Sequence, residues 1–345
     1  SAAQKKALDA KPAASTKLVW LYPYDQTVWP LGLLAPLLQW DFDPATPADA
    51  IKLQLDSQYY TYTGYFARPA ALTAGAPFVR HPIPQAVWDA ATRSSARSTL
   101  KVQLTVLTGN KALGPFTETW PIAGTSLKGT VYYQSYGTEL AKNNTGAIGG
   151  DGKFGGATLA ISGGDTSPSL VAGSDGDGNQ CRVCHVISAD GSRMIVQRGI
   201  PYPYLDSSSY ALNLTGYPET PYAAATSGVM GWAGLSPDGK LALGNAGPLE
   251  GNANTNSSAG SQLLDAATGM PLASKGLTTF VTRAAMPVFS PDGTKVAFTF
   301  FEGPGNTTIG AGNESKLVVM DCAAKTKTFS QRVLVYEGKG GARPG

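Results

Sequence analysis

Two of the three cysteines and one of the two histidines of this 345-residue chain lie within five consecutive residues, Cys181-Arg182-Val183-Cys184-His185. Two thiols separated by two residues and followed directly by a histidine form the pattern at which c-type haem is attached. In that chemistry the thiols add across the porphyrin vinyl groups, and the imidazole binds the iron. The spacing therefore predicts a haem c anchored by Cys181 and Cys184, with His185 as the proximal ligand.

Other uses of the same residues compete with haem attachment. A Cys181–Cys184 disulfide requires only an oxidising compartment, and free structural thiols require even less. A thioredoxin-like redox pair is disfavoured, because such a pair opens a helix whereas this one leads into an expected strand. A zinc site needs four ligands, and only Cys322 and His81 remain elsewhere in the chain. The disulfide is the main alternative.

The second axial ligand of such a haem is not defined by the spacing. The candidates are His81, the other histidine, and Met194, nine residues beyond His185 along the same expected strand. Met230 and Met286 precede later repeats and are weaker candidates. Each methionine is expected more often in the core than on a metal, and His81, beside Pro82, is expected in a surface loop.

A second ion site is suggested directly before the cysteines. Asp175, Asp177 and Asn179 alternate in the sequence GSDGDGNQ, which is how calcium loops present their oxygen atoms. The glutamate expected at the twelfth position is replaced by Val186, and glycine-rich acidic loops are also ordinary turns. A structural calcium ion therefore remains a secondary hypothesis.

These candidate residues need a scaffold, and the first part of the chain predicts a β-sandwich. Short strand-like runs separated by proline and glycine fill residues 17–124. In the run AIKLQLDS, Ile51, Leu53 and Leu55 alternate with polar residues, which is typical of a half-buried strand. About seven such runs indicate an immunoglobulin-like or fibronectin-like sandwich, in which Trp40 is a core residue.

The second part of the chain, residues 125–345, repeats one unit. The stretches VISADGSRMIVQRG, GLSPDGKLALGNAG and VFSPDGTKVAFTFFEG each place an apolar residue before Ser-x-Asp-Gly and a strand after it. The three serines, Ser188, Ser236 and Ser290, are 48 and 54 residues apart. A repeat of this length built from strands and turns indicates propeller blades. The last unit ends where a further blade strand is expected, so the ring is expected to be incomplete.

The Ser-Pro-Asp-Gly repeats resemble those of TolB-like β-propellers. The junction CRVCHVISADG also resembles one found in exported propeller proteins of some bacteria, especially myxobacteria-like ones. That second resemblance implies a haem-binding blade. The fold class is therefore predicted as all-β, with an immunoglobulin-like sandwich followed by a TolB-like propeller whose last blades are missing.

Charge and hydropathy argue against several classes of function. A net charge of +3 without clusters of Lys or Arg gives no support for nucleic-acid binding. No run of 18 apolar residues predicts a transmembrane segment. Residues 1–16, polar and alanine-rich, are expected to be a flexible start left after export, so a periplasmic, surface or extracellular location is expected. No hydrolase or transferase constellation is found, so the chain is not expected to be an enzyme.

The preferred function is electron transfer or haem-based sensing, with a redox protein as partner. The alternative is a non-enzymatic envelope or extracellular scaffold, such as a filament or surface-assembly subunit, held by a Cys181–Cys184 disulfide. Its partner would be an envelope or surface protein, and a homo-oligomer or larger assembly is compatible with either function.

Overall fold

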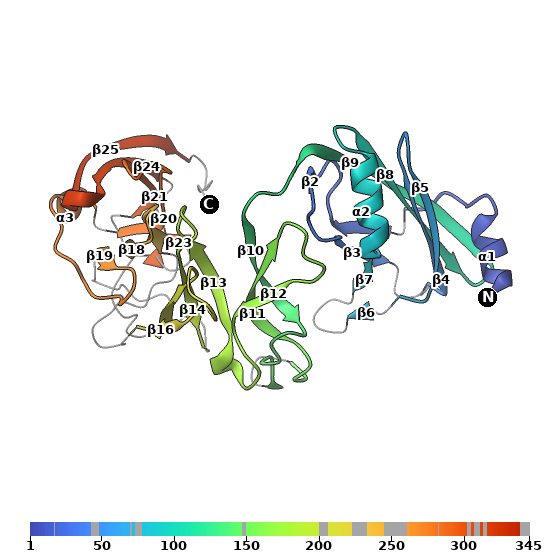
Figure 1. Cartoon of the computed structure of the whole chain (residues 1–345), viewed down its shortest axis with the longest axis horizontal. Coiled ribbons are helices and arrows are strands. Elements are labelled where there is room, and N and C mark those ends of the chain that lie inside the picture. The colour runs from blue at the N-terminus through green and yellow to red at the C-terminus, as the bar shows by residue number, and fades with distance from the viewer. Residues whose placement is uncertain are drawn as a thin grey trace. The chain divides into compact units, whose positions relative to one another are not determined.

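The computed structural model describes residues 1–16, 18–42, 48–69, 71–72, 78–146, 150–199, 206–222, 233–244, 261–281, 283–301, 305–306, 311–312 and 316–338. The chain divides into unit 1, Ser1–Tyr132 with Ala160–Ser169, and unit 2, Tyr133–Leu159 with Leu170–Gly345. The sequence predicted the boundary between the two parts near residue 124. In the structure the first stretch of unit 1 extends to Tyr132, and the later segment Ala160–Ser169 also belongs to unit 1. Strands dominate both units, so the all-β prediction is confirmed (Figure 1).

The described residues of unit 1 form two sheets and two helices. One sheet has the strand order β2-β9-β8-β4-β5 and the other the order β1-β3-β7-β6. All the pairings are antiparallel except that of β2 with β9. The elements are α1 (Ala2–Asp9), β1 (Leu18–Tyr22), β2 (Trp29–Leu31), β3 (Leu37–Phe42), β4 (Ala50–Asp56), β5 (Thr61–Ala67), β6 (Ala71–Leu72), β7 (Phe78–Pro82), α2 (Gln85–Ser94), β8 (Thr99–Thr108) and β9 (Lys111–Ser126).

The core of unit 1 is built from alternating strand residues and tryptophans. Ile51, Leu53 and Leu55 are fully buried, as their spacing predicts, and Trp40 is fully buried on β3. Trp29 contacts the rings of both Trp88 and Trp120, with centroids 5.3 and 5.9 Å away. Helix α2, which the sequence pattern did not predict, supplies Trp88 to this cluster.

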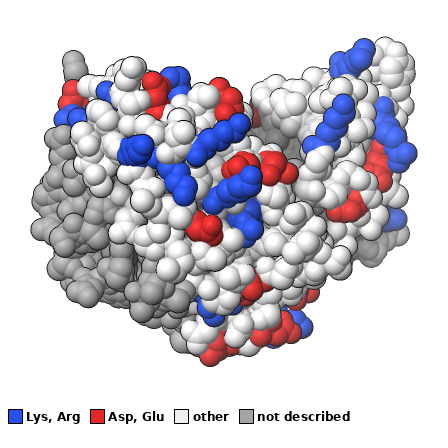
Figure 2. Space-filling model, turned by 60° about the vertical axis from the view of Figure 1, so that its left-hand side comes forward, with Lys and Arg blue, Asp and Glu red and all other residues white. Residues whose placement is uncertain are grey.

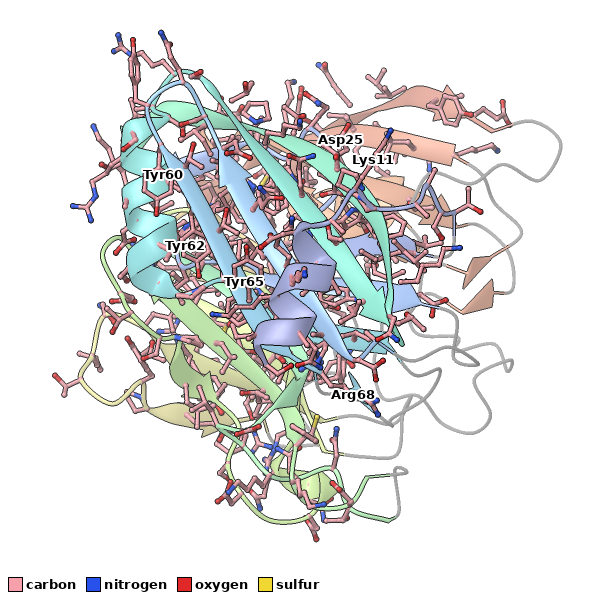
Figure 3. All side chains as sticks on the ribbon, turned by 90° about the vertical axis from the view of Figure 1, so that its right-hand side faces the viewer. Lys11, Asp25, Tyr60, Tyr62, Tyr65 and Arg68 are labelled. Atoms are coloured by element: carbon pink, nitrogen blue, oxygen red, sulfur yellow. The ribbon has the colours of Figure 1, made fainter. Side chains whose placement is uncertain are left out.

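The start of the chain is a helix rather than the flexible segment expected. Helix α1 begins with a capping box, in which Ser1 and Gln4 exchange hydrogen bonds. Leu8 is 1% exposed and packs with Ala50 and Leu107, and Asp9 accepts a 2.6 Å hydrogen bond from the Tyr65 hydroxyl. Figure 3 shows α1 lying across the sheet next to Tyr65. An alanine-rich sequence folds here because one leucine finds an apolar site on the sheet.

In the described part of unit 2, three antiparallel sheets are of the propeller-blade type, and they are named blades I, II and III. Their strand orders are β13-β14-β15-β16, β17-β18-β19 and β20-β21-β24-β25. The blade strands are β13 (Arg182–Ile187), β14 (Arg193–Arg198), β15 (Asp206–Ala211), β16 (Glu219–Pro221), β17 (Gly234–Leu235), β18 (Leu241–Gly244), β19 (Gln262–Asp265), β20 (Arg283–Phe289), β21 (Lys295–Phe301), β24 (Lys316–Ala323) and β25 (Thr328–Glu337). The first strands are neighbours, since β17 contacts both β13 and β20.

The remaining described strands and short helices are not part of the three blades. A further sheet has the order β10-β11-β12, and the boundary between the units falls within its strands. A two-stranded sheet pairs β22 with β23. These elements are β10 (Thr130–Thr138), β11 (Gly155–Ser162), β12 (Ser169–Ala172), the short 3-10 helices η2 (Gly178–Gln180) and η3 (Ala324–Thr326), α3 (Leu277–Phe280), β22 (Gly305–Asn306) and β23 (Ala311–Gly312).

The Ser-x-Asp-Gly turn has the same hydrogen bonds in all three blades. In blade II the Ser236 hydroxyl donates to Asp238 at 2.8 Å and accepts from the Leu241 backbone N–H at 2.9 Å. Gly239 adopts φ +65°, the left-handed conformation that this turn requires. Blades I and III repeat the network through Ser188 with Asp190 and Ser290 with Asp292. The motif therefore encodes the turn between the first two strands of each blade.

Charged side chains are interspersed on the surface. Figure 2 shows Lys and Arg lying among Asp and Glu on the face in view, where most of the described surface is uncharged. Among the described helices, none is long and apolar enough to cross a membrane.

Candidate functional site

The cysteine motif leads into the first strand of blade I. Helix η2 ends at Gln180; the next residue, Cys181, adopts an extended conformation, and β13 runs from Arg182 through Cys184 and His185 to Ile187. The pairing of β13 with β14 is interrupted between Val183 and Val186, so that Cys184 and His185 form a bulge. Cys184 has φ +54°, in the left-handed region that residues other than glycine seldom adopt. His185 thus lies at the entrance of a blade, as the sequence predicts.

The bulge is a feature of the blade, because blade III has it too. In β20 the pairing with β21 is interrupted between Ala285 and Val288, and Met286 has φ +48°. Met286 and Pro287 are the two residues before Val288, just as Cys184 and His185 are the two residues before Val186. The motif is therefore placed on a bulge that the repeat itself supplies, and bulges redirect side chains next to functional sites.

The two thiols of the motif are not bonded to each other. Cys181 is 7% exposed, and its sulfur lies against β11, where a Cβ added to Gly156 would be 2.5 Å from Sγ. Cys184 is half-buried, and its backbone N–H donates to the side-chain carbonyl of Gln134. Only glycine at position 156 leaves room for the Cys181 sulfur.

Tyr136 on β10 interacts with both thiols. Its hydroxyl is hydrogen-bonded to Cys184 and lies close enough to Cys181 to interact electrostatically. Burial raises the pKa of the Cys184 thiol to about 11, against the opposing effect of that hydrogen bond, and also raises the pKa of Cys181. Partial burial raises the pKa of Tyr136 to about 12. In the absence of a bound group, both thiols are therefore protonated at neutral pH.

Arg182, the residue between the cysteines, is anchored in the blade. Its guanidinium forms a two-pronged ion pair with Glu219 of β16, with N–O distances of 2.8 and 3.3 Å. It also donates to the backbone carbonyls of Asn179 and Cys181. Burial alone would raise the pKa of Glu219, but the hydrogen bonds and the charge of Arg182 hold it below its ordinary value. These contacts fix the backbone on both sides of Cys181.

The candidates for a second axial ligand lie in different surroundings from those expected. His81 is a buried residue of β7 in unit 1, not a surface-loop residue, and its ring contacts Phe66 with centroids 4.3 Å apart. Burial lowers the pKa of His81 to about 4, so its imidazole is neutral. Met194 is fully buried on β14, the neighbouring strand, where it pairs with Ile187. Met230 lies outside the described residues.

The predicted calcium oxygens have backbone partners. Asp175 accepts from the backbone N–H of Lys142 at 2.8 Å, and Asp177 accepts from that of Asn179 at 3.0 Å. In the part of the chain that the structure describes, no group of three or more His, Cys, Asp or Glu side chains is placed to hold a metal ion. Calcium binding stays a prediction from the sequence.

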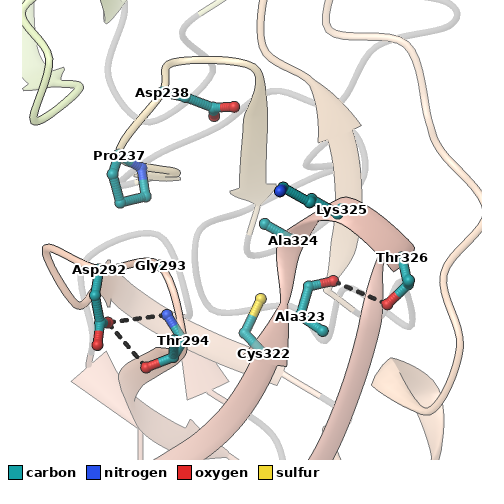
Figure 4. Close-up of a pocket in the computed structure, with 10 residues that line it drawn as sticks. All are labelled: Pro237, Asp238, Asp292, Gly293, Thr294, Cys322, Ala323, Ala324, Lys325 and Thr326. Atoms are coloured by element: carbon teal, nitrogen blue, oxygen red, sulfur yellow. Dashed lines mark hydrogen bonds between the residues drawn. The ribbon is translucent and has the colours of Figure 1, made fainter.

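Among the described residues, two clefts lie near the blade turns. The larger, about 410 Å³, is lined by residues of blades II and III, including Asp238, Asp292 and Cys322 (Figure 4). The smaller, about 160 Å³, lies where β13, β17 and β20 meet. In the larger cleft Asp292 is hydrogen-bonded to Thr294, and bonds from Ser290 and Thr294 lower the pKa of Asp292 to about 2. The Asp292 carboxylate thus already accepts hydrogen bonds from residues of the turn.

The partners of the motif are not apparent from the sequence. Gln134, Tyr136 and Gly156 lie well upstream of Cys181, and Glu219 lies downstream. No local pattern identifies them, because strand pairing alone brings them to the cysteines. An arginine between two cysteines could have suggested a buried acidic partner.

No protein-family model matches the chain, and no curated protein matches it. TolB from Acinetobacter baumannii is 13% identical over 86% of this chain and 66% of its own, with a TM-score of 0.33. A protein assigned as TolB from Agrobacterium tumefaciens is 13% identical over 85% of this chain and 91% of its own, also with a TM-score of 0.33. A protein assigned as a 6-phosphogluconolactonase from Bacteroides uniformis has a TM-score of 0.30, at 12% identity over 86% and 84% of the two chains. The chain thus spans just under two thirds of the Acinetobacter protein.

Proposed function

We propose that Cys181, Cys184 and His185 hold one covalently attached c-type haem, and that the chain is an exported electron-transfer protein. The observation that carries this proposal is the arrangement of the motif. Two unbonded thiols both interact with Tyr136, and the half-buried His185 follows Cys184 on the bulge. When bound, the haem would supply one-electron redox chemistry.

The surrounding residues fit such a group in their chemical type. Gly156 leaves the room that the Cys181 sulfur occupies. The ion pair of Arg182 with Glu219 holds the strand that carries the motif. His185 would bind the iron as a neutral imidazole, and the thiols would be the covalent anchors. Each residue therefore has a role that its position supports.

A second candidate function is a scaffold without haem, and one observation favours it. Cys181 is buried against β11, and buried thiols with raised pKa values are unreactive. In that case the cysteine pair packs the start of blade I, as free thiols or as a disulfide, and the sheets supply binding surfaces for an envelope or surface protein.

The deciding experiment expresses the chain with export in a bacterium that attaches c-type haem. Haem attachment predicts sharp absorption bands on reduction, and after denaturation a mass raised by one haem that maps to the peptide containing Cys181 and Cys184. Cys181→Ser or Cys184→Ser should reduce covalent attachment, and His185→Ala should change the spectrum. Cys322→Ser is the matched control, because Cys322 is a buried cysteine outside the motif. Colourless protein of unmodified mass would refute haem attachment and support the scaffold.

A further inference from the structure

The two thiols of the motif share one neighbour, Tyr136 of β10. The Tyr136 hydroxyl donates a hydrogen bond to Cys184 and interacts electrostatically with Cys181. The tyrosine ring also lies beside the Cys181 sulfur, because both are near a single point above Gly156. A Cβ added to Gly156 would be 2.5 Å from the Cys181 Sγ and 3.7 Å from the Tyr136 Cδ1. One tyrosine thus lies next to both members of the cysteine pair.

The two cysteines are held by different strands. The Cys181 sulfur occupies the space left by Gly156 of β11, and Cys181 is 7% exposed. The backbone N–H of Cys184 donates to the Gln134 side chain of β10, on the same strand as Tyr136. Arg182, between the cysteines, is fixed in blade I by its ion pair. The backbone around both thiols is therefore restrained.

A disulfide between the two cysteines would break some of these contacts. It requires the sulfur atoms to lie about 2 Å apart, whereas both thiols are free in the structure. Either the Cys181 sulfur would have to leave the space above Gly156, or the Cys184 sulfur would have to leave the Tyr136 hydroxyl. The oxidised pair therefore loses interactions that the reduced pair has.

Burial also slows the oxidation of these thiols. Thiol–disulfide exchange proceeds through a thiolate, and burial raises the pKa of Cys184 to about 11. About one Cys184 in ten thousand is then ionised at pH 7. The same surroundings that favour the free thiols thus keep them unreactive towards a disulfide oxidant.

We propose that Tyr136 is a positioning residue that holds Cys181 and Cys184 as two free thiols and disfavours their oxidation to a disulfide. In that oxidation each cysteine loses one proton and one electron, and a disulfide such as oxidised glutathione takes them up and becomes two thiols. The Tyr136 hydroxyl opposes this step because its hydrogen bond to the Cys184 sulfur exists only in the reduced arrangement.

Such a restraint has a use in a chain that is exported. Oxidising compartments convert neighbouring thiols to disulfides. Haem attachment needs both cysteines as thiols, since each sulfur bonds to one vinyl carbon and its proton goes to the other. Tyr136 thus keeps the motif ready for haem. This use rests on the proposed function, whereas the effect of Tyr136 on the thiols does not.

The test is the thiol–disulfide equilibrium of the full chain, produced without haem. The chain is equilibrated with mixtures of reduced and oxidised glutathione, quenched in acid, unfolded, alkylated and weighed intact. With three cysteines in the chain, the reduced form gains three alkyl groups and the form with a motif disulfide gains one. The wild type should form this disulfide less readily than the same chain equilibrated in urea.

Tyr136→Phe keeps the ring and removes the hydroxyl. It should raise the equilibrium constant for disulfide formation at least about threefold, the worth of one modest hydrogen bond. Because Tyr136 is 57% exposed, the change should leave the fold intact. Tyr59→Phe is the matched control, since Tyr59 is a tyrosine of unit 1 that is 75% exposed, and it should leave the constant unchanged.

Equal constants for the wild type and Tyr136→Phe would overturn the proposal. So would a wild type that forms the disulfide as readily as the chain in urea. These outcomes are separate from the test for haem. A chain that attaches haem while Tyr136→Phe has no effect would refute only this role of Tyr136. A colourless chain whose equilibrium responds to Tyr136→Phe would support this role and refute the haem.

Discussion

Cys184 and Met286 occupy the same position of the same bulge in blades I and III, with φ values of +54° and +48°. A cysteine of the candidate haem motif and an ordinary methionine thus share one strained backbone conformation. The strain belongs to the repeat, and the motif uses a bend that the propeller blade already contains.

The bulge in blade III can be tested without disturbing the motif. Met286→Ile should destabilise the chain by about 1 to 2 kcal/mol more than Met286→Leu, because a side chain branched at Cβ is poorly accommodated at positive φ. The measurement is urea unfolding followed by tryptophan fluorescence. Equal destabilisation by the two changes would show that the left-handed conformation is not retained in solution.

The serine hydroxyl of the repeated turn should contribute most to the free energy of unfolding in blade II. Ser236 is fully buried, and its hydroxyl accepts from the backbone N–H of Leu241. Ser236→Ala should cost about 2 kcal/mol, because the N–H is left buried without its partner. Ser290→Ala, at a more exposed copy of the turn, should cost less than half as much, since water can replace the hydroxyl. The free energies of unfolding of the two variants give the comparison.

Unit 1 should lose stability as the pH rises towards neutral. Burial raises the pKa of Glu118 from 4.5 to about 7, while the Trp120 indole, 3.0 Å from its carboxylate, has the opposite effect. The folded state therefore prefers the protonated acid, so the contribution of Glu118 is complete below pH 4.5 and is lost as the pH rises through 7. The loss should be on the order of 2 kcal/mol.

Glu118→Gln should remove this dependence, because the amide keeps an acceptor for Trp120 and does not ionise. Its unfolding free energy should exceed that of the wild type above neutral pH and approach it in acid. Lys101→Gln, at an exposed position of β8, is a control for changing a surface charge. Parallel pH profiles for the wild type and Glu118→Gln would contradict the assignment.

Helix α1 should be part of the cooperative fold. Leu8→Ala should destabilise unit 1 by about 2 kcal/mol, because it leaves a cavity between Ala50 and Leu107. Ala3→Gly, on the exposed side of the helix, should cost about 1 kcal/mol or less. Limited proteolysis should cut near residue 10 faster in Leu8→Ala. An unchanged rate of cleavage would indicate that the helix does not dock in solution.

The sequence by itself determined the strands, the repeated turns and the place of the motif. Alternation predicted β4, and the Ser-x-Asp-Gly pattern predicted the turn of each blade, because both depend on residues that are close together in the chain. It also placed His185 at the entrance of blade I. Local chemistry is sufficient for features whose hydrogen bonds close within a few residues.

Only the tertiary structure decided which distant residues meet. Tyr136 on β10 and Gly156 on β11 lie next to the cysteines because these two strands pair with each other in one sheet. Glu219 contacts Arg182 from the fourth strand of blade I. The same reason explains the errors for the start of the chain and for His81. Leu8 and His81 have neighbours in sequence that suggest exposure, but a sheet assembled from distant segments provides the sites that bury them.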